Sequence, residues 1–205
     1  MSAPSEAHDA SCATCRRGRP RSERVKHKVL EAAAELLEKR GFKGLTIEAV
    51  AERAGASKVT IYRWWPGKAA LATDAFLAVL APLAPFPESR SPLEDLREHI
   101  FGLVSVLTGR WGPVTASLIA EGVSDPEVRA AMLARWIEPR RVQARKVVAR
   151  AIEAGEMHPE VDPEVVLDSL YGPLYLRLLF GHEPLDAAFA TQMWKNALAG
   201  SAVAR

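Results

Sequence analysis

Apolar side chains recur every three or four residues along most of this chain, which is the period of an amphipathic α-helix. No segment alternates apolar and polar residues as a half-buried strand does. The pattern predicts helices over about residues 67–80, 92–108, 113–122, 126–154, 163–180 and 186–199. It also predicts a first helix over residues 22–40, ended by Gly41, with an apolar stripe of Val25, Val29, Ala32, Ala33, Leu36 and Leu37. We therefore predict an all-α fold.

Prolines and composition divide the predicted helices into groups. Residues 81–91 are rich in proline, which interrupts helical continuity, and are predicted to form a linker. Pro139 lies inside a long predicted helix and is expected to bend it. Residues 1–14 lack apolar periodicity and are expected to be a flexible tail. The expected parts are a tail with a basic arm (1–21), an amino-terminal three-helix domain (22–68), a connecting helix and linker (69–91) and a carboxy-terminal helical domain (92–205).

Residues 46–68 read as two short helices on either side of a sharp turn. Thr46 is a residue type that caps helix starts, and Gly55 enters the left-handed conformation that stops a helix at little steric cost. Ser57 is expected to cap a second helix over about residues 58–65, which a Pro-Gly pair then ends. This is the helix-turn-helix pattern, whose second helix enters the major groove of DNA.

The second helix carries side chains suited to that task. Lys58, Thr60, Tyr62 and Arg63 offer donors, a methyl group and a ring to phosphates and base edges, whereas Val59 can anchor the helix or its neighbours. Lys68 stands at the predicted start of the next helix. There its ammonium and the free amides of the first helical turn can together bind one phosphate. We predict that this surface binds double-stranded DNA.

These residues resemble the DNA-binding domain of the tetracycline-repressor (TetR) family of bacterial transcription regulators. The resemblance spans about fifty residues and is carried by Ala33, Leu36, Leu37, Gly41-Phe42, Leu45-Thr46, Ile47, Val50-Ala51, Ala54-Gly55, Ser57, Thr60, Tyr62, Lys68 and Leu71. In that family the positions that commonly touch DNA are those of Thr46, Lys58, Thr60, Tyr62 and Lys68. With the neighbouring side chains, our predicted DNA-binding set adds Ser57, Val59, Arg63 and Trp64.

Two points about this surface stay open at the level of sequence. The chain has Trp64-Trp65 where many family members have His or Tyr followed by Phe, so Trp64 either packs against sugars or faces the core. A three-helix bundle with another role would also show such spacing, with Tyr62 and Trp65 as core residues. Charge favours DNA, because residues 16–68 hold 14 Lys and Arg against 6 Asp and Glu, whereas residues 69–205 hold 13 against 17.

The segment Arg16-Arg17-Gly18-Arg19-Pro20-Arg21 is a basic arm that Gly and Pro are expected to keep extended. Its Gly-Arg-Pro core resembles an AT-hook, and Arg19 and Arg21 are predicted to touch DNA. They either read a narrow minor groove or make nonspecific phosphate contacts.

The resemblance implies a homodimer paired through the last two helices and a small-molecule effector bound in the carboxy-terminal domain. Candidate interface residues are Leu170, Leu174, Leu178, Phe189, Met193 and Ala197. Candidate pocket residues, which core packing explains equally well, are Phe101, Val104, Trp111, Leu118, Met132, Trp136, Tyr171 and Tyr175. An apolar or aromatic effector of moderate size is the corresponding hypothesis.

Other classes of protein find little support in the sequence. The five histidines are scattered, and no motif of a zinc protease, a serine hydrolase or a phosphate-binding loop occurs, so we expect neither catalysis nor a cofactor. Cys12 and Cys15 have a CxxC spacing, but a zinc site there would lack half its ligands. The basic residues after Pro139 fit a solvated helix face better than a second nucleic-acid surface. No apolar run reaches membrane-spanning length, so a cytoplasmic protein is expected.

The interpretation that the sequence supports best is that the protein is a sequence-specific transcriptional regulator. We expect a repressor that leaves a pseudo-palindromic operator when it binds its effector. The competing reading is an architectural DNA protein that uses its basic surface without choosing a sequence.

Overall fold

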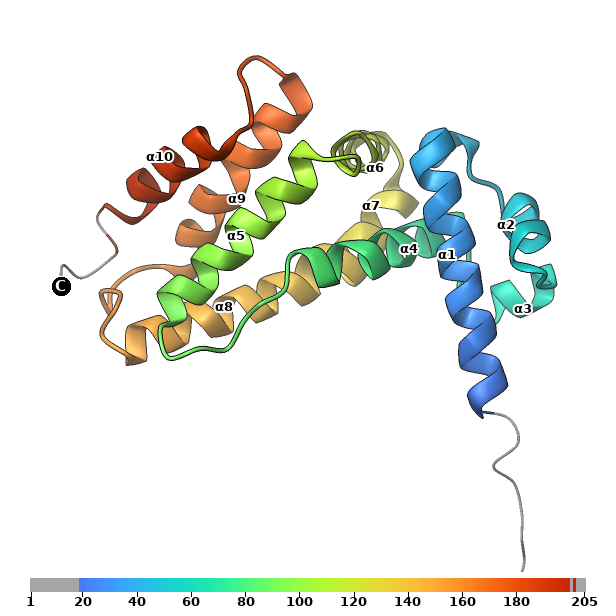
Figure 1. Cartoon of the computed structure of the whole chain (residues 1–205), viewed down its shortest axis with the longest axis horizontal. Coiled ribbons are helices and arrows are strands. Elements are labelled where there is room, and N and C mark those ends of the chain that lie inside the picture. Colours follow the sequence, from blue (N-terminus) through green and yellow to red (C-terminus); the bar gives the residue numbers. More distant parts are fainter. Residues whose placement is uncertain (1–18, 200, 202–205) are drawn as a thin grey trace, which may run out of the picture.

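The computed structural model describes residues 19–199 and residue 201 of the chain (Figure 1). About 78% of the chain is helical, and the described residues contain no strand, which confirms the all-α prediction. The amino-terminal part consists of α1 (Arg19–Gly44), α2 (Ile47–Ala54) and α3 (Lys58–Tyr62). The remainder consists of α4 (Lys68–Leu83), α5 (Pro92–Thr108), α6 (Gly112–Ser124), α7 (Pro126–Met132), a π-helical turn η1 (Leu133–Ile137), α8 (Glu138–Glu153), α9 (Pro163–Phe180) and α10 (Ala187–Leu198).

The α1 helix differs from its prediction at both ends. It starts at Arg19, so the last residues of the expected extended arm are helical, which corrects that prediction. Pro20 is compatible with this start because the amides of the first helical turn have no intrahelical partner to lose. Gly41 leaves helical geometry with a φ of 65°, as expected for the residue that ends the main helix, although three more helical residues follow.

Two further helix ends were placed wrongly from the sequence. The α3 helix stops at Tyr62 rather than near Trp65. The amides of Trp64 and Trp65 then both bond to the Ile61 carbonyl at 3.0 Å, which closes a turn before Pro66. The α4 helix continues through Pro82 to Leu83. A proline in the last turn disturbs little of the helix behind it.

The helix expected to bend at Pro139 contains a π-helical turn, which the sequence did not predict, just before this proline. The turn η1 lies directly before α8, and Pro139 occupies the first turn of α8. A π turn adds one residue to the helix, which rotates every following side chain by about 100° relative to a regular helix. The α8 side chains therefore face other directions than a regular helix over residues 126–154 would give them.

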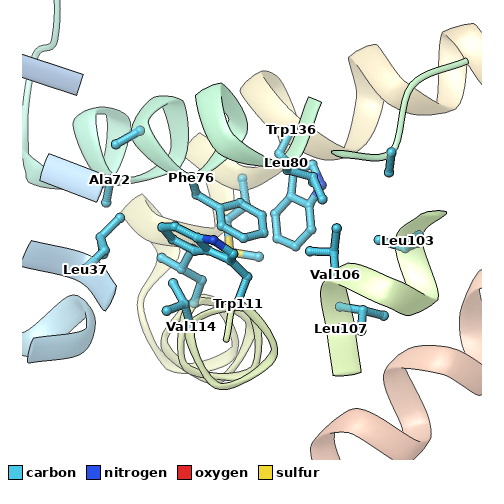
Figure 2. Close-up of a cluster of buried hydrophobic side chains, with 14 of the residues drawn as sticks. Leu37, Ala72, Phe76, Leu80, Leu103, Val106, Leu107, Trp111, Val114 and Trp136 are labelled. Atoms are coloured by element: carbon cyan, nitrogen blue, oxygen red, sulfur yellow. The ribbon is translucent and has the colours of Figure 1, made fainter. Parts of the chain in front are cut away.

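The α4 helix lies between the two parts of the molecule and has half of its side chains buried. On one side Ala72 lies beside Leu37 of α1 (Figure 2). Further along, the Phe76 ring lies 6.3 Å from the Trp111 ring and 4.9 Å from the Trp136 ring, measured between centroids. The core is therefore continuous from the amino-terminal domain into the carboxy-terminal domain.

His99 is a buried polar residue at the end of this core, with 1% of its surface exposed. Its Nδ1 faces the carbonyls of Pro85 and Ala84 at 2.9 and 3.2 Å, so we assign the proton to Nδ1. Its Nε2 then accepts a hydrogen bond of 2.8 Å from the Tyr171 hydroxyl. Burial, with the nearby Arg140 charge, lowers the pKa of His99 to about 4. His99 thus joins α5, the segment after α4, and α9 as a neutral side chain.

In the part of the chain that the structure describes, no helix is both long and apolar enough to cross a membrane.

The lowered pKa of His99 predicts a pH dependence of stability. Below its ordinary pKa of 6.5 the unfolded chain binds a proton at this residue, while the folded chain does so only near pH 4. The free energy of unfolding should therefore fall as pH falls through this window, by about 3 kcal/mol at its lower end. Chemical unfolding across the window should show a shallower pH slope in His99→Gln than in the parent chain.

The matched control is His182→Gln, which changes a histidine that is exposed in the structure. This variant should keep the parent's slope. An equal slope in His99→Gln and the parent would show that His99 does not stay neutral in the fold.

Candidate DNA-binding surface and ligand cavity

The caps predicted for the helix-turn-helix pair are present. The Thr46 hydroxyl accepts a hydrogen bond from the Ala49 amide at 3.2 Å, at the start of α2. Gly55 ends α2 in the left-handed conformation with a φ of 62°. The Ser57 hydroxyl accepts from the Thr60 amide at 3.1 Å, at the start of α3. These short-range bonds define where the two helices start and where α2 ends, as the sequence indicated.

Buried residues hold the pair against α1 and α4. Ile61 on α3 is fully buried, and Trp65 is 1% exposed. The Trp65 Nε1 donates a hydrogen bond of 2.8 Å to Oδ2 of Asp74 on α4. Of the two adjacent tryptophans, Trp65 is therefore the buried one. Trp64 is half-buried and meets the Trp65 ring edge-on, with 5.6 Å between centroids.

The opposite face of α3 is open to solvent. Val59 is 74% exposed and Tyr62 is 52% exposed, and Lys58 and Arg63 are exposed as well. Val59 thus points outward and does not anchor the helix. Thr60 is half-buried, and its hydroxyl shares a hydrogen bond of 2.9 Å with that of Ser57. The face combines a cation, a guanidinium, a ring and an apolar group on one short helix.

Lys58 on this face and Lys68 at the start of α4 have different surroundings. The Lys58 Nζ lies 3.1 Å from Oε1 of Glu48 on α2, so a phosphate would have to replace this exposed carboxylate. The Lys68 Nζ lies over the Phe42 ring, 4.3 Å from its centroid. It stands at the start of α4, whose cap Gly67 makes no side-chain hydrogen bond to the first amides. Lys68 and these amides fit the predicted phosphate position.

The remaining predicted DNA contacts lie near this surface or outside the described side chains. Thr46 and Ser57 are exposed, beside the starts of α2 and α3. Arg19 and Arg21 are described only as helical backbone in the first turn of α1. Residues 16–18, and with them the rest of the basic arm, lie outside the described residues, as do Cys12 and Cys15.

A cavity of about 240 Å³ opens between the helices of the carboxy-terminal domain. Half of the predicted pocket residues line it, namely Met132, Trp136, Tyr171 and Tyr175. The sequence interpretation missed the rest of the lining, which is Leu80, Leu103, Ile119, Ile137, Arg140 and Arg141. Its wall therefore includes side chains from α4 through α9.

The other four predicted pocket residues lie elsewhere. Val104, Trp111 and Leu118 are 5%, 4% and 1% exposed and pack in the core. Phe101 is half-buried beneath the Arg97 guanidinium, 4.9 Å from it. Core packing and cavity lining select the same residue types, so the sequence held no signal that separates them.

The two arginines of the cavity wall follow the π-helical turn. Arg141 makes ion pairs with Glu164 and Asp168 of α9, the latter at 2.6 Å. Arg140 donates to the Ala84 carbonyl instead. The sequence interpretation had placed both on a solvated helix face. Pro139 was the one available sign that the helix is irregular there and that its facing could not be read from a regular period.

The fold and the exposed α3 face define a helix-turn-helix DNA-binding protein. Residues 29–75 match the family model described as bacterial regulatory proteins, tetR family, and residues 86–197 match the model described as tetracyclin repressor-like, C-terminal domain. The chain belongs to the TetR family and is a DNA-binding transcriptional regulator.

Relatives and solved structures agree over most of the chain. It is 37% identical over 185 residues to the HTH-type transcriptional regulator YdeS of Bacillus subtilis (strain 168), covering 90% of this chain and 93% of that protein. It is 24% identical over 160 residues to the regulator AqdR of Rhodococcus erythropolis, covering 78% and 77%. The crystal structure of the TetR family transcription regulator SCO0332 superposes with a TM-score of 0.77 at 35% identity, covering 88% and 99%.

The open α3 face predicts that Lys58 contributes to DNA binding and to sequence choice. Lys58→Ala should weaken binding by about 1–3 kcal/mol and relax the preferred sequence, as expected for a residue that reaches base edges. Fluorescence anisotropy with a preferred duplex and with single-base variants of it measures both effects.

The control variant is Lys39→Ala, which removes the same charge from an exposed side chain of α1 that lies 3.8 Å from Glu35. It should bind within about a factor of two of the parent, because isolated surface charges contribute little. An equal loss in both variants, with the base preference unchanged, would assign Lys58 a general electrostatic role.

Proposed function

We propose that this protein is a homodimeric repressor that binds a pseudo-palindromic operator and leaves it when a small molecule occupies the cavity. It acts in the cytoplasm, as a binding protein and not as an enzyme. Each protomer places its α3 helix in one major groove. The observation that carries the proposal is that α4 starts at the DNA-binding surface with Lys68 and contributes Leu80 to the cavity wall.

The proposed dimer contact uses the exposed side of α9. Leu170, Leu174 and Met193, which the sequence nominated for the interface, are 0%, 0% and 6% exposed and belong to the protomer's own core. Leu178, Phe189 and Ala197 are half-buried. An apolar stripe at helical spacing remains exposed on α9, formed by Val165, Leu176, Leu179 and Phe180. A second copy of the chain covers this stripe in our proposal.

The proposed release of DNA needs a physical link from the cavity to α3. Asp74 on α4 provides one, because its Oδ2 accepts hydrogen bonds from Trp65 Nε1 at 2.8 Å and from Arg135 at 2.7 Å. Arg135 belongs to η1, whose Trp136 and Ile137 line the cavity. A ligand that binds better to one spacing of the two α3 helices than to the other shifts the equilibrium, typically by about 1–3 kcal/mol.

Selection from a random DNA pool at near-physiological salt tests the operator proposal. We expect enrichment of an inverted repeat whose half-sites are separated by about one helical turn, 34–36 Å. The mass of the complex should correspond to one dimer or a pair of dimers on each duplex. Salt-sensitive binding without enrichment would support an architectural DNA protein instead.

A charge on the exposed α9 stripe should disrupt the proposed dimer. Phe180→Glu places a carboxylate in a contact that an apolar anchor otherwise fills, and we expect a loss of about 2 kcal/mol or more in dimerisation. Operator affinity should fall with it, since the two half-sites then lose their linkage. Sedimentation equilibrium and duplex binding measure the two effects.

Val123→Glu is the matched control, because Val123 on α6 is 73% exposed and Phe180 is 75% exposed. The control should remain dimeric. Phe180→Glu dimerising as tightly as Val123→Glu would place the subunit contact on another face.

A further inference from the structure

One side of the ligand cavity is polar although most of its wall is apolar. Leucine, isoleucine and methionine form much of the wall, and the Trp136 and Tyr175 rings meet there with 6.4 Å between centroids. The polar side is formed by Arg140, Arg141, Tyr171 and Tyr175. A few polar groups in a largely apolar cavity are the usual means of fixing one ligand chemistry and orientation.

The two arginines of this polar side differ in how their charges are balanced. Arg141 is paired with Glu164 and Asp168. Arg140 has no carboxylate within 4.0 Å among the residues that the structure describes. Its guanidinium donates to the Ala84 carbonyl and lies 5.0 Å from the centroid of the Phe86 ring. The nearby carboxylates of α8 and α9 are engaged by Arg141 and Arg145.

The two tyrosines also differ in their hydrogen bonds. The Tyr171 hydroxyl donates to His99 Nε2 at 2.8 Å. The Tyr175 hydroxyl has no hydrogen-bond partner within residues 19–199 of the structure. Burial raises the pKa of Tyr175 to about 12, so its hydroxyl keeps its proton and remains a donor. The cavity therefore offers a cation and a phenolic donor, and no free acceptor of comparable strength.

We propose that the effector of this regulator is an organic anion, a carboxylate on a small apolar or aromatic body, whose carboxylate pairs with Arg140 and accepts from Tyr175. The inference rests on the proposed function, in which the cavity holds the effector. A guanidinium presents parallel donors that match the two oxygens of a carboxylate. The apolar wall takes the rest of the molecule. With about 240 Å³, the cavity is smaller than the roughly 300–1,000 Å³ of sites for drug-sized ligands, which limits the body to a single ring or a short chain.

Arg140 also connects this anion to the helix that reaches the DNA-binding surface. Ala84, whose carbonyl accepts from Arg140, is the cap residue at the end of α4. An anion that draws the guanidinium into the cavity competes with this carbonyl. It thereby weakens the hydrogen bond between Arg140 and the end of α4. The ligand thus binds one position of α4 better than the other, which is what release from DNA requires.

Pairs of acids and their primary amides test the inference with the full-length protein. Benzoate, phenylacetate, 3-phenylpropionate and hexanoate, each beside its amide, differ in charge at nearly constant shape. Calorimetry and tryptophan fluorescence near pH 7 measure binding, with Trp136 in the cavity wall as the reporter. We expect at least one acid to bind about tenfold or more tightly than its amide, as for a charge-assisted hydrogen bond.

Variants assign the preference to Arg140. In Arg140→Gln the acid and its amide should bind about equally, whereas Arg140→Lys should keep part of the preference. Lys146→Gln removes the same charge from an exposed position of α8 and should leave the preference unchanged. Tyr175→Phe should weaken the acid more than the amide.

The outcomes separate this inference from the proposed function. Amides that bind as tightly as acids, a preference that persists in Arg140→Gln, or a panel in which no acid binds would each overturn the anion inference. None of these results bears on the operator, which the selection of inverted repeats decides on the same preparation. The comparison of acids with amides uses the parent chain alone, so it stands even where Arg140→Gln fails to fold.

Discussion

The α4 helix packs against both parts of the molecule, so its position constrains the amino-terminal and carboxy-terminal domains alike. Most of its buried positions near the DNA-binding end are alanines, and α1 packs against α4. Further along, Phe76 and Leu80 enter the aromatic core of the carboxy-terminal domain. Because close-packed side chains leave little room for independent movement, a shift of α4 at one end displaces the side chains that pack against its other end. The two domains therefore share one helix and one core.

Partly buried polar contacts fix this helix at two places. Asp74 holds Trp65 of the DNA-binding domain and Arg135 of η1, and the Ala84 carbonyl faces His99 and Arg140. Partners of this kind must stay matched, since a buried polar group without one is costly. The second contact lies at the cavity wall, where Arg140 also meets the ligand in our proposal. In our proposal Arg140 thus contacts both the ligand and the end of α4.

The sequence predicted best what depends on neighbouring residues. Thr46, Gly55 and Ser57 act as the expected caps because each bond spans only a few residues. The bounds of α5 and α9 were also predicted as observed, since capping residues and prolines mark their starts. The end of α4 was predicted too early, because Pro82 lies in the last turn, where a proline disturbs little of the helix behind it. The π turn was missed because its extra residue leaves no periodic signal.

The all-α class, the resemblance to the TetR family and the place of the helix-turn-helix pair followed from the sequence, because periodicity, capping and residue type are local properties of the chain. Which side of each carboxy-terminal helix faces the core follows from packing between residues distant in sequence, which the periodicity of one helix does not encode. The α9 helix is apolar on nearly every side, so spacing alone did not show that Leu170 and Leu174 pack inward while Leu176 and Phe180 face solvent. In the same way, the position of Arg140 at the cavity depends on the rotation that η1 introduces and on helices distant in sequence.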